Sequence, residues 1–93
     1  MGAVQSPDLG CLHVLLVDDN DINQRLASAL LAARGHTVKV VGDGQEALEA
    51  LGDASFDLVL MDIQLPDVSG LSLLEELTQR LPQLPVILSL IHI

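Results

Sequence analysis

Two short apolar runs, His13–Val17 and residues 58–61, constrain the fold of this chain more than any other feature. Neither run alternates between apolar and polar side chains, as a strand with one solvated face would. Strands that read as continuous apolar runs are typical of parallel sheets covered by helices on both faces. We therefore expect a strand at each of these two places and helical connections beside them.

The segment between the two runs contains a pattern typical of a helix followed by a more polar strand. From Ile22 the apolar side chains recur at helical spacing, and Gly35 is expected to stop that helix. Residues 37–41 predict a second strand, which is more polar than the first and is therefore expected near an edge of the sheet. The apolar face expected on the first helix consists of Ile22, Leu26, Ala29, Leu30 and Ala33.

Two further helices and a fourth strand are predicted by capping residues and by apolar spacing. Asp43 followed by Glu46 resembles a capping box, and Gly52 is expected to close that helix. A third helix is expected over residues 70–81, and a fourth strand begins at residues 86–88. The predicted inner faces are Ala47, Leu48 and Leu51 on the second helix, and Leu71, Leu74, Leu77 and Leu81 on the third.

The predicted elements alternate as β-α-β-α-β-α-β, which indicates an α/β fold with a doubly wound parallel sheet. Residues 1–12 have no periodicity and are expected to form a flexible leader, followed by a single domain over residues 13–93. At 93 residues the chain is long enough for one small domain.

Charge and composition exclude several classes of function. The net charge of −9 argues against nucleic-acid binding by this segment. No apolar run reaches the roughly 18 residues of a membrane span, and the N-terminus does not resemble a signal peptide. The single cysteine, Cys11, fits a reducing compartment, and we expect a cytoplasmic location.

Acidic residues follow two of the predicted strands directly. Asp18 and Asp19 follow the first strand, and Asp62 ends the third. Function in open parallel sheets collects at the carboxyl ends of the strands, so these carboxylates are expected to converge if the two strands are neighbours. Taken singly, each aspartate could be a helix cap or a loop residue, and only the combination points to a site. A hard cation such as Mg²⁺ would offset the mutual repulsion of the three carboxylates.

Two segments of the sequence resemble the signature segments of two-component receiver domains. They are residues 14–24, VLLVDDNDINQ, and residues 58–70, LVLMDIQLPDVSG. The resemblance covers about residues 12–87 and is greatest to receivers of hybrid sensor kinases and phosphorelays. It implies a flavodoxin-like sheet of order 2-1-3-4-5, and Pro66 and Gly70 match the turn into the third helix of that family.

The resemblance also implies a role for individual residues. Asp62 would be the phosphoacceptor and also a Mg²⁺ ligand. Asp19 would be a direct Mg²⁺ ligand, and Asp18 a ligand through water or a residue that positions the metal. The backbone carbonyl of Gln64 would complete the protein ligands. The phosphoryl group would come from a phosphohistidine on a histidine kinase or a histidine phosphotransfer domain. The receiver would catalyse its own phosphorylation and slow dephosphorylation, and no general metabolic reaction.

The sequence departs from the family pattern towards its C-terminal end. The switch hydroxyl of receivers ends the fourth strand, but Ser89 lies about one position early and Leu90 occupies the expected place. Ser89 is therefore a candidate for that hydroxyl, with an incidental strand serine as the alternative. The family's lysine, fifth strand and last two helices are missing, and the only lysine is Lys39. We expect a C-terminally truncated receiver, with sheet order 2-1-3-4, that self-associates through the fourth-strand edge or is partly disordered over residues 88–93.

Two other functions are compatible with the same residues. Without the lysine, the domain could be a receiver-like interaction module that works independently of phosphorylation. A Mg²⁺-dependent phosphohydrolase with an aspartate nucleophile is the third alternative. Such enzymes usually carry a second acid two residues after the nucleophile, where this chain has Gln64, which counts against turnover.

Overall fold

The computed structural model describes residues 11–62, 65, 67 and 69–89 of the chain. Strands and helices alternate over this range as the sequence predicts. The elements are β1 (His13–Val17), α1 (Asp21–Ala33), β2 (Thr37–Val41), α2 (Gly44–Asp53), β3 (Leu58–Asp62), α3 (Gly70–Arg80) and β4 (Val86–Ser89). Residues 1–10 of the predicted leader lie outside the described residues. Leu12 is bonded to the start of β2, since its carbonyl accepts from the amide of Thr37 at 2.8 Å.

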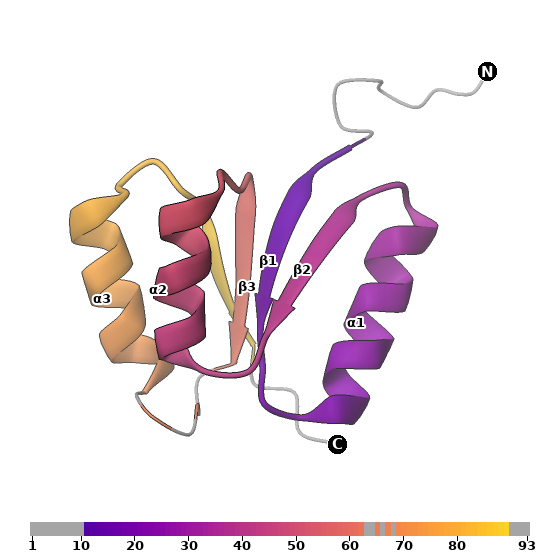
Figure 1. The fold of residues 1–93 in the computed structure, drawn as a ribbon, viewed down its shortest axis with the longest axis horizontal. Coiled ribbons are helices and arrows are strands. Elements are labelled where there is room, and N and C mark those ends of the chain that lie inside the picture. Colours follow the sequence, from indigo (N-terminus) through magenta and orange to yellow (C-terminus); the bar gives the residue numbers. More distant parts are fainter. Residues whose placement is uncertain (1–10, 63–64, 66, 68, 90–93) are drawn as a thin grey trace.

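The strands form one parallel sheet of order β2-β1-β3-β4, which confirms the predicted order. β1 and β3 lie in the centre of the sheet, which explains why their sequences are continuously apolar. β2 lies at one edge, in agreement with its more polar sequence. The α1 helix covers one face of the sheet, and α2 and α3 cover the other (Figure 1).

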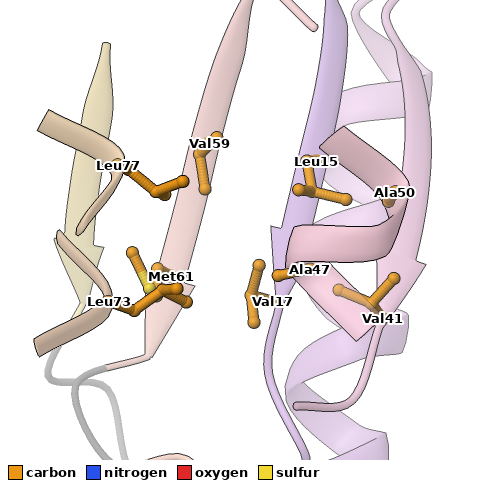
Figure 2. Packing of buried hydrophobic residues seen from close by; sticks show 9 residues of the cluster. All are labelled: Leu15, Val17, Val41, Ala47, Ala50, Val59, Met61, Leu73 and Leu77. Carbon is orange, nitrogen blue, oxygen red and sulfur yellow. The ribbon is translucent and has the colours of Figure 1, made fainter. Parts of the chain in front are cut away.

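The hydrophobic core lies between the sheet and the α2–α3 layer. Alternate residues of the central strands point into it, among them Leu15 and Val17 of β1 and Val59 and Met61 of β3. Figure 2 shows two groups of contacts in this layer. Ala47 and Ala50 of α2 lie over β1 together with Val41, and Leu73 and Leu77 of α3 lie over β3.

The predicted inner face of α1 is not buried, which corrects the expectation from its spacing. None of the residues of α1 is buried, and Ile22, Leu26 and Leu30 are 50% to 57% exposed. Ile22, Leu26 and Leu30 do share one side of the helix, but each keeps half or more of its surface exposed. Spacing alone locates an apolar stripe and does not show what packs on it.

The prediction of which residues form the inner face of α3 was wrong in part. Leu77 is buried as expected, but its buried partners are Leu73 and Gly70, while Leu71 is 55% exposed and Leu81 is also exposed. Leucines at 71, 73, 74, 77 and 81 form two overlapping helical stripes. The orientation of the helix against β3 decides which stripe is buried.

The two predicted glycine stops have different outcomes. Gly35 has a φ of 90°, and the amides of Gly35 and His36 bond to the carbonyls of Ala32 and Leu31, which is the pattern of a Schellman motif. This left-handed conformation favours glycine, so the predicted end of α1 is confirmed. Gly52, by contrast, lies inside α2, which continues to Asp53, so the predicted stop there was wrong.

β4 is the outermost strand of the sheet formed by the described residues. Leu88 and Ser89, for which partial disorder was one expectation, lie in this strand and pair with Met61 and Asp62. Residues 90–93 lie outside the described residues. Self-association through the β4 edge stays a prediction. No helix in the described ranges combines the length and the apolar character that crossing a bilayer requires.

Candidate functional site

Asp18 is held at the carboxyl end of β1 by its backbone and by its side chain. Its amide donates to the carbonyl of Val41 at the end of β2 (3.1 Å), which fixes the backbone between two strands. Its carboxylate Oδ1 accepts from the amide of Asn20 at 2.9 Å. Gln24, one turn into α1, donates its side-chain amide to the Asp18 carbonyl. The backbone and one carboxylate oxygen of Asp18 are therefore oriented before any ligand binds.

The residue that follows Asp18 and Asp19 defines the start of α1. Asn20 is the N-cap of the helix, and its side-chain oxygen accepts from the amide of Asn23 at 3.0 Å. This contact satisfies one of the amides that lack a partner at a helix start. The cap turns the chain away from the sheet directly after Asp19.

Asp62 is the last residue of β3 and lies beside Asp18. β1 and β3 pair in register up to Val17 and Met61. The next residues, Asp18 and Asp62, therefore lie side by side at the carboxyl ends of these two neighbouring strands. Each is 8% exposed, and they are the buried charged residues of the described part of the chain. Burial of carboxylates is costly unless they are hydrogen-bonded or bind a cation.

Asp18, Asp19 and Asp62 form the acidic cluster that the sequence predicts. One carboxylate oxygen from each lies within 4.8 Å of the others. Asp19 is exposed, so the cluster is open to solvent on its side. Oxygen ligands around a Mg²⁺ ion lie 2.0–2.1 Å from the metal, so opposite ligands are about 4.2 Å apart. The donor set therefore fits a hard divalent cation that keeps several waters, and the spread of up to 4.8 Å is close to that spacing.

An open cleft of about 460 Å³ leads from the acidic cluster along the α1 face of the sheet. Asp18 and Asp62 lie at its polar end. Its apolar wall consists of side chains of the sheet and of the exposed stripe of α1, including Leu16, Leu26, Leu30, Leu60 and Ile87. Asp18 and Asp62 are thus accessible from this face although their side chains are largely buried.

Other residues singled out from the sequence are only partly placed by the structure. Gln64, the predicted carbonyl ligand, and Pro66 lie outside the described residues. The backbone of Ser89 pairs with Asp62 in the parallel register of β3 and β4, and its role as switch hydroxyl stays a prediction. Lys39 is exposed in the middle of β2, opposite Leu15, and not at the acidic end of the sheet.

Two contacts of the site were missed by reasoning from sequence. Gln24 supports the backbone of Asp18, and Asp67 bonds to the start of α2. Spacing could not have revealed either contact. A glutamine in a first helical turn is ordinarily a solvent-exposed helix former, and Asp67 lies more than twenty residues from its partners.

A family model for the response regulator receiver domain matches residues 14–92 of this chain. The chain belongs to the response regulator receiver family. The predicted resemblance is therefore confirmed, and the receiver fold places the acidic cluster at the carboxyl ends of its two central strands. Receiver domains generally use Mg²⁺ at an acidic pocket and interact with histidine kinases or phosphotransfer proteins.

Similar proteins include both sensor kinases and response regulators. The receiver is 45% identical over 75 residues to the aerobic respiration control sensor protein ArcB of Escherichia coli, covering 81% of this chain and 10% of ArcB. It is 43% identical to the response regulator mcs4 of Schizosaccharomyces pombe, covering 82% of this chain and 14% of mcs4. The chain thus spans about a tenth of the length of the curated relatives it matches.

Solved structures of receivers share the fold. NtrX of Brucella abortus aligns with a TM-score of 0.80 at 34% identity, over 84% of this chain and 18% of NtrX. TrrA of Thermotoga maritima, solved in complex with Mg²⁺ and BeF, aligns with a TM-score of 0.79 at 30% identity, over 82% of this chain and 66% of TrrA. These likenesses confirm the flavodoxin-like architecture over the described strands and helices.

Proposed function

We propose that this receiver accepts a phosphoryl group on the carboxylate of Asp62 from a phosphohistidine. The observation that carries the proposal is the cluster of three carboxylates, contributed by the ends of two neighbouring central strands. In the transfer, a carboxylate oxygen of Asp62 forms a bond to phosphorus while the P–N bond to the donor imidazole breaks. The imidazole keeps the electron pair of that bond and takes up a proton.

The other aspartates of the cluster would hold Mg²⁺ beside Asp62. Asp19 is exposed and would bind the ion directly, while Asp18 would bind it through water or position it. The carbonyl of Gln64 would be a further ligand. When bound, Mg²⁺ neutralises negative charge on the phosphoryl oxygens, which otherwise repel an anionic nucleophile. The hydrogen bond from the Asn20 amide keeps the Asp18 carboxylate oriented for this role.

The phosphoryl donor would be a histidine kinase or a histidine phosphotransfer domain in the cytoplasm. The similarity to sensor proteins such as ArcB supports a phosphorelay setting for this receiver. The single cysteine is consistent with a reducing compartment. Ser89 would be the candidate that contacts the phosphoryl group from β4, whose backbone pairs with Asp62.

A second candidate function is an interaction module that does not depend on phosphorylation. Lys39 lies in the middle of β2, opposite Leu15, and is therefore not placed to contact a phosphoryl group on Asp62. This domain would present the receiver surface to partners while Asp62 stays unmodified.

Incubation with Mg²⁺ and a small phosphodonor tests the proposed function. We expect intact-mass spectrometry to detect one phosphoryl group per chain, and we expect the uptake to disappear when Mg²⁺ is removed with a chelator. Uptake that is insensitive to the chelator would contradict the proposed metal site. No uptake at saturating donor and Mg²⁺ would contradict the phosphoacceptor function and favour the interaction module.

The substitution Asp18→Asn or Asp19→Asn is expected to weaken Mg²⁺ binding. Loss of one carboxylate ligand should lower the affinity at least tenfold, or roughly 1.4 kcal/mol, in isothermal titration calorimetry. Asp53→Asn is the matched control, because it removes one negative charge at the end of α2, outside the acidic cluster. An equal loss of affinity in all three variants would mean that net charge, and not the cluster, attracts the cation.

A further inference from the structure

The carboxylate of Asp67 holds the start of α2. Its Oδ1 accepts from the amide of Gly44 at 2.8 Å, and its Oδ2 accepts from the amide of Gln45 at 2.9 Å. Asp67 lies in the connection between β3 and α3, five residues after Asp62. These two hydrogen bonds therefore join the connection that follows the candidate phosphoacceptor to the start of α2, the helix that follows the edge strand β2.

Asp67 supplies hydrogen-bond acceptors to the first amides of α2 from a distant part of the sequence. The first amides of a helix have no intrahelical acceptor. The side chain of Asp43, the N-cap, accepts from the amide of Glu46 at 2.8 Å, while the amides of Gly44 and Gln45 donate to Asp67. A carboxylate at a helix start is favoured by the helix dipole, and its hydrogen bonds are stronger than neutral ones. The three leading amides of α2 are thus all bonded to carboxylates, two of them to a distant one.

The same contact restrains the connection between β3 and α3. The connection begins at Asp62, and Ser69 ends it as the N-cap of α3. Between these ends, Leu65 packs partly buried against the hydrophobic core, and Asp67 is bonded to α2. Figure 1 places the carboxyl ends of the strands and the first turns of α2 and α3 at the same end of the molecule. Leu65 and Asp67 are thus two described residues of this connection that contact other parts of the domain.

We propose that Asp67 is a positioning residue for phosphoryl transfer to Asp62, acting by fixing the β3–α3 connection on the N-terminus of α2. This inference rests on the proposed function and deepens it. Asp67 does not touch the phosphoryl group. It couples the acidic site to α2. Coupling between binding free energies is reciprocal, so we expect binding of Mg²⁺ and beryllofluoride at the acidic site to change how firmly the start of α2 is held.

Two alanine variants separate this role from simple helix capping. Asp67→Ala and Asp43→Ala each remove a carboxylate acceptor from the N-terminus of α2, but only Asp67 also belongs to the β3–α3 connection. We expect Asp67→Ala to slow phosphoryl uptake from the small donor roughly 2- to 30-fold, and Asp43→Ala to leave the rate unchanged. Asp67→Asn keeps one acceptor oxygen, so its rate should lie between those of the wild type and Asp67→Ala.

Amide hydrogen exchange tests the coupling from the opposite direction. In the wild type, Mg²⁺ with beryllofluoride should slow exchange at Gly44 and Gln45 relative to Glu46, whose amide is bonded to Asp43. In Asp67→Ala these two amides should exchange roughly fivefold faster than in the wild type. Addition of Mg²⁺ and beryllofluoride to this variant should leave the ratio to Glu46 unchanged.

The outcomes distinguish this inference from the proposed function. If the wild type is phosphorylated but Asp67→Ala matches it in rate and in the response of the Gly44 and Gln45 amides, Asp67 has no positioning role and the phosphoacceptor function stands. Equal slowing by Asp67→Ala and Asp43→Ala would overturn the inference as well, because capping alone would explain it. A wild type that takes up no phosphoryl group contradicts the proposed function itself.

Discussion

Asp62→Asn is expected to abolish phosphoryl uptake at every donor and Mg²⁺ concentration. The carboxamide has nearly the same shape as the carboxylate, but it lacks the anionic oxygen that forms the bond to phosphorus. Asp62 is 8% exposed beside Asp18, so removing its charge also relieves repulsion within the acidic cluster. The variant should therefore stay folded while intact-mass spectrometry detects no phosphorylated chain.

The matched control for this prediction is Asp53→Asn. It makes the same chemical change at the end of α2, outside the acidic cluster, and should leave uptake at the wild-type level. Far-ultraviolet circular dichroism of both variants checks that the helices persist. Phosphoryl uptake by Asp62→Asn at a rate close to that of the wild type would place the acceptor on another residue and would refute the assignment of Asp62.

Leu77→Ala is expected to produce a large loss of stability. Leu77 is 1% exposed and packs over β3 in the hydrophobic core (Figure 2). Truncating a buried leucine removes its transfer free energy and leaves a cavity, which costs about 2–5 kcal/mol of the free energy of unfolding. Small domains have only about 5–15 kcal/mol in total, so urea denaturation should show a large shift to lower midpoint.

Leu71→Ala is the control within the same helix. Leu71 is 55% exposed, and alanine is at least as good a helix former as leucine, so the free energy of unfolding should change by no more than about 0.5 kcal/mol. The sequence placed both leucines on the inner face of the helix, whereas the structure buries only Leu77. Equal destabilisation by the two substitutions would show that the helix is rotated relative to the arrangement described above.

The acidic site is the part of the receiver that the sequence predicted most completely. Asp18, Asp19 and Asp62 could be assigned because each directly follows or ends an apolar strand, and because parallel strands end at the same edge of a sheet. These are local and topological facts, and they do not depend on how side chains pack. The contribution of Gln64 and the hydroxyl role of Ser89 stay predictions, since they depend on the β3–α3 connection and on the end of β4.

The sequence by itself determined the order of the strands and helices, their bounds to within a residue or two, and the convergence of the three aspartates. Continuous apolar runs, N-caps and Gly35 suffice for this because they act over a few neighbouring residues. Only the tertiary structure decided which stripe of α3 is buried, that the apolar side of α1 is exposed, and that Asp67 caps α2. These features depend on the orientation of one element against another, and partners distant in sequence leave no periodic signal in either segment.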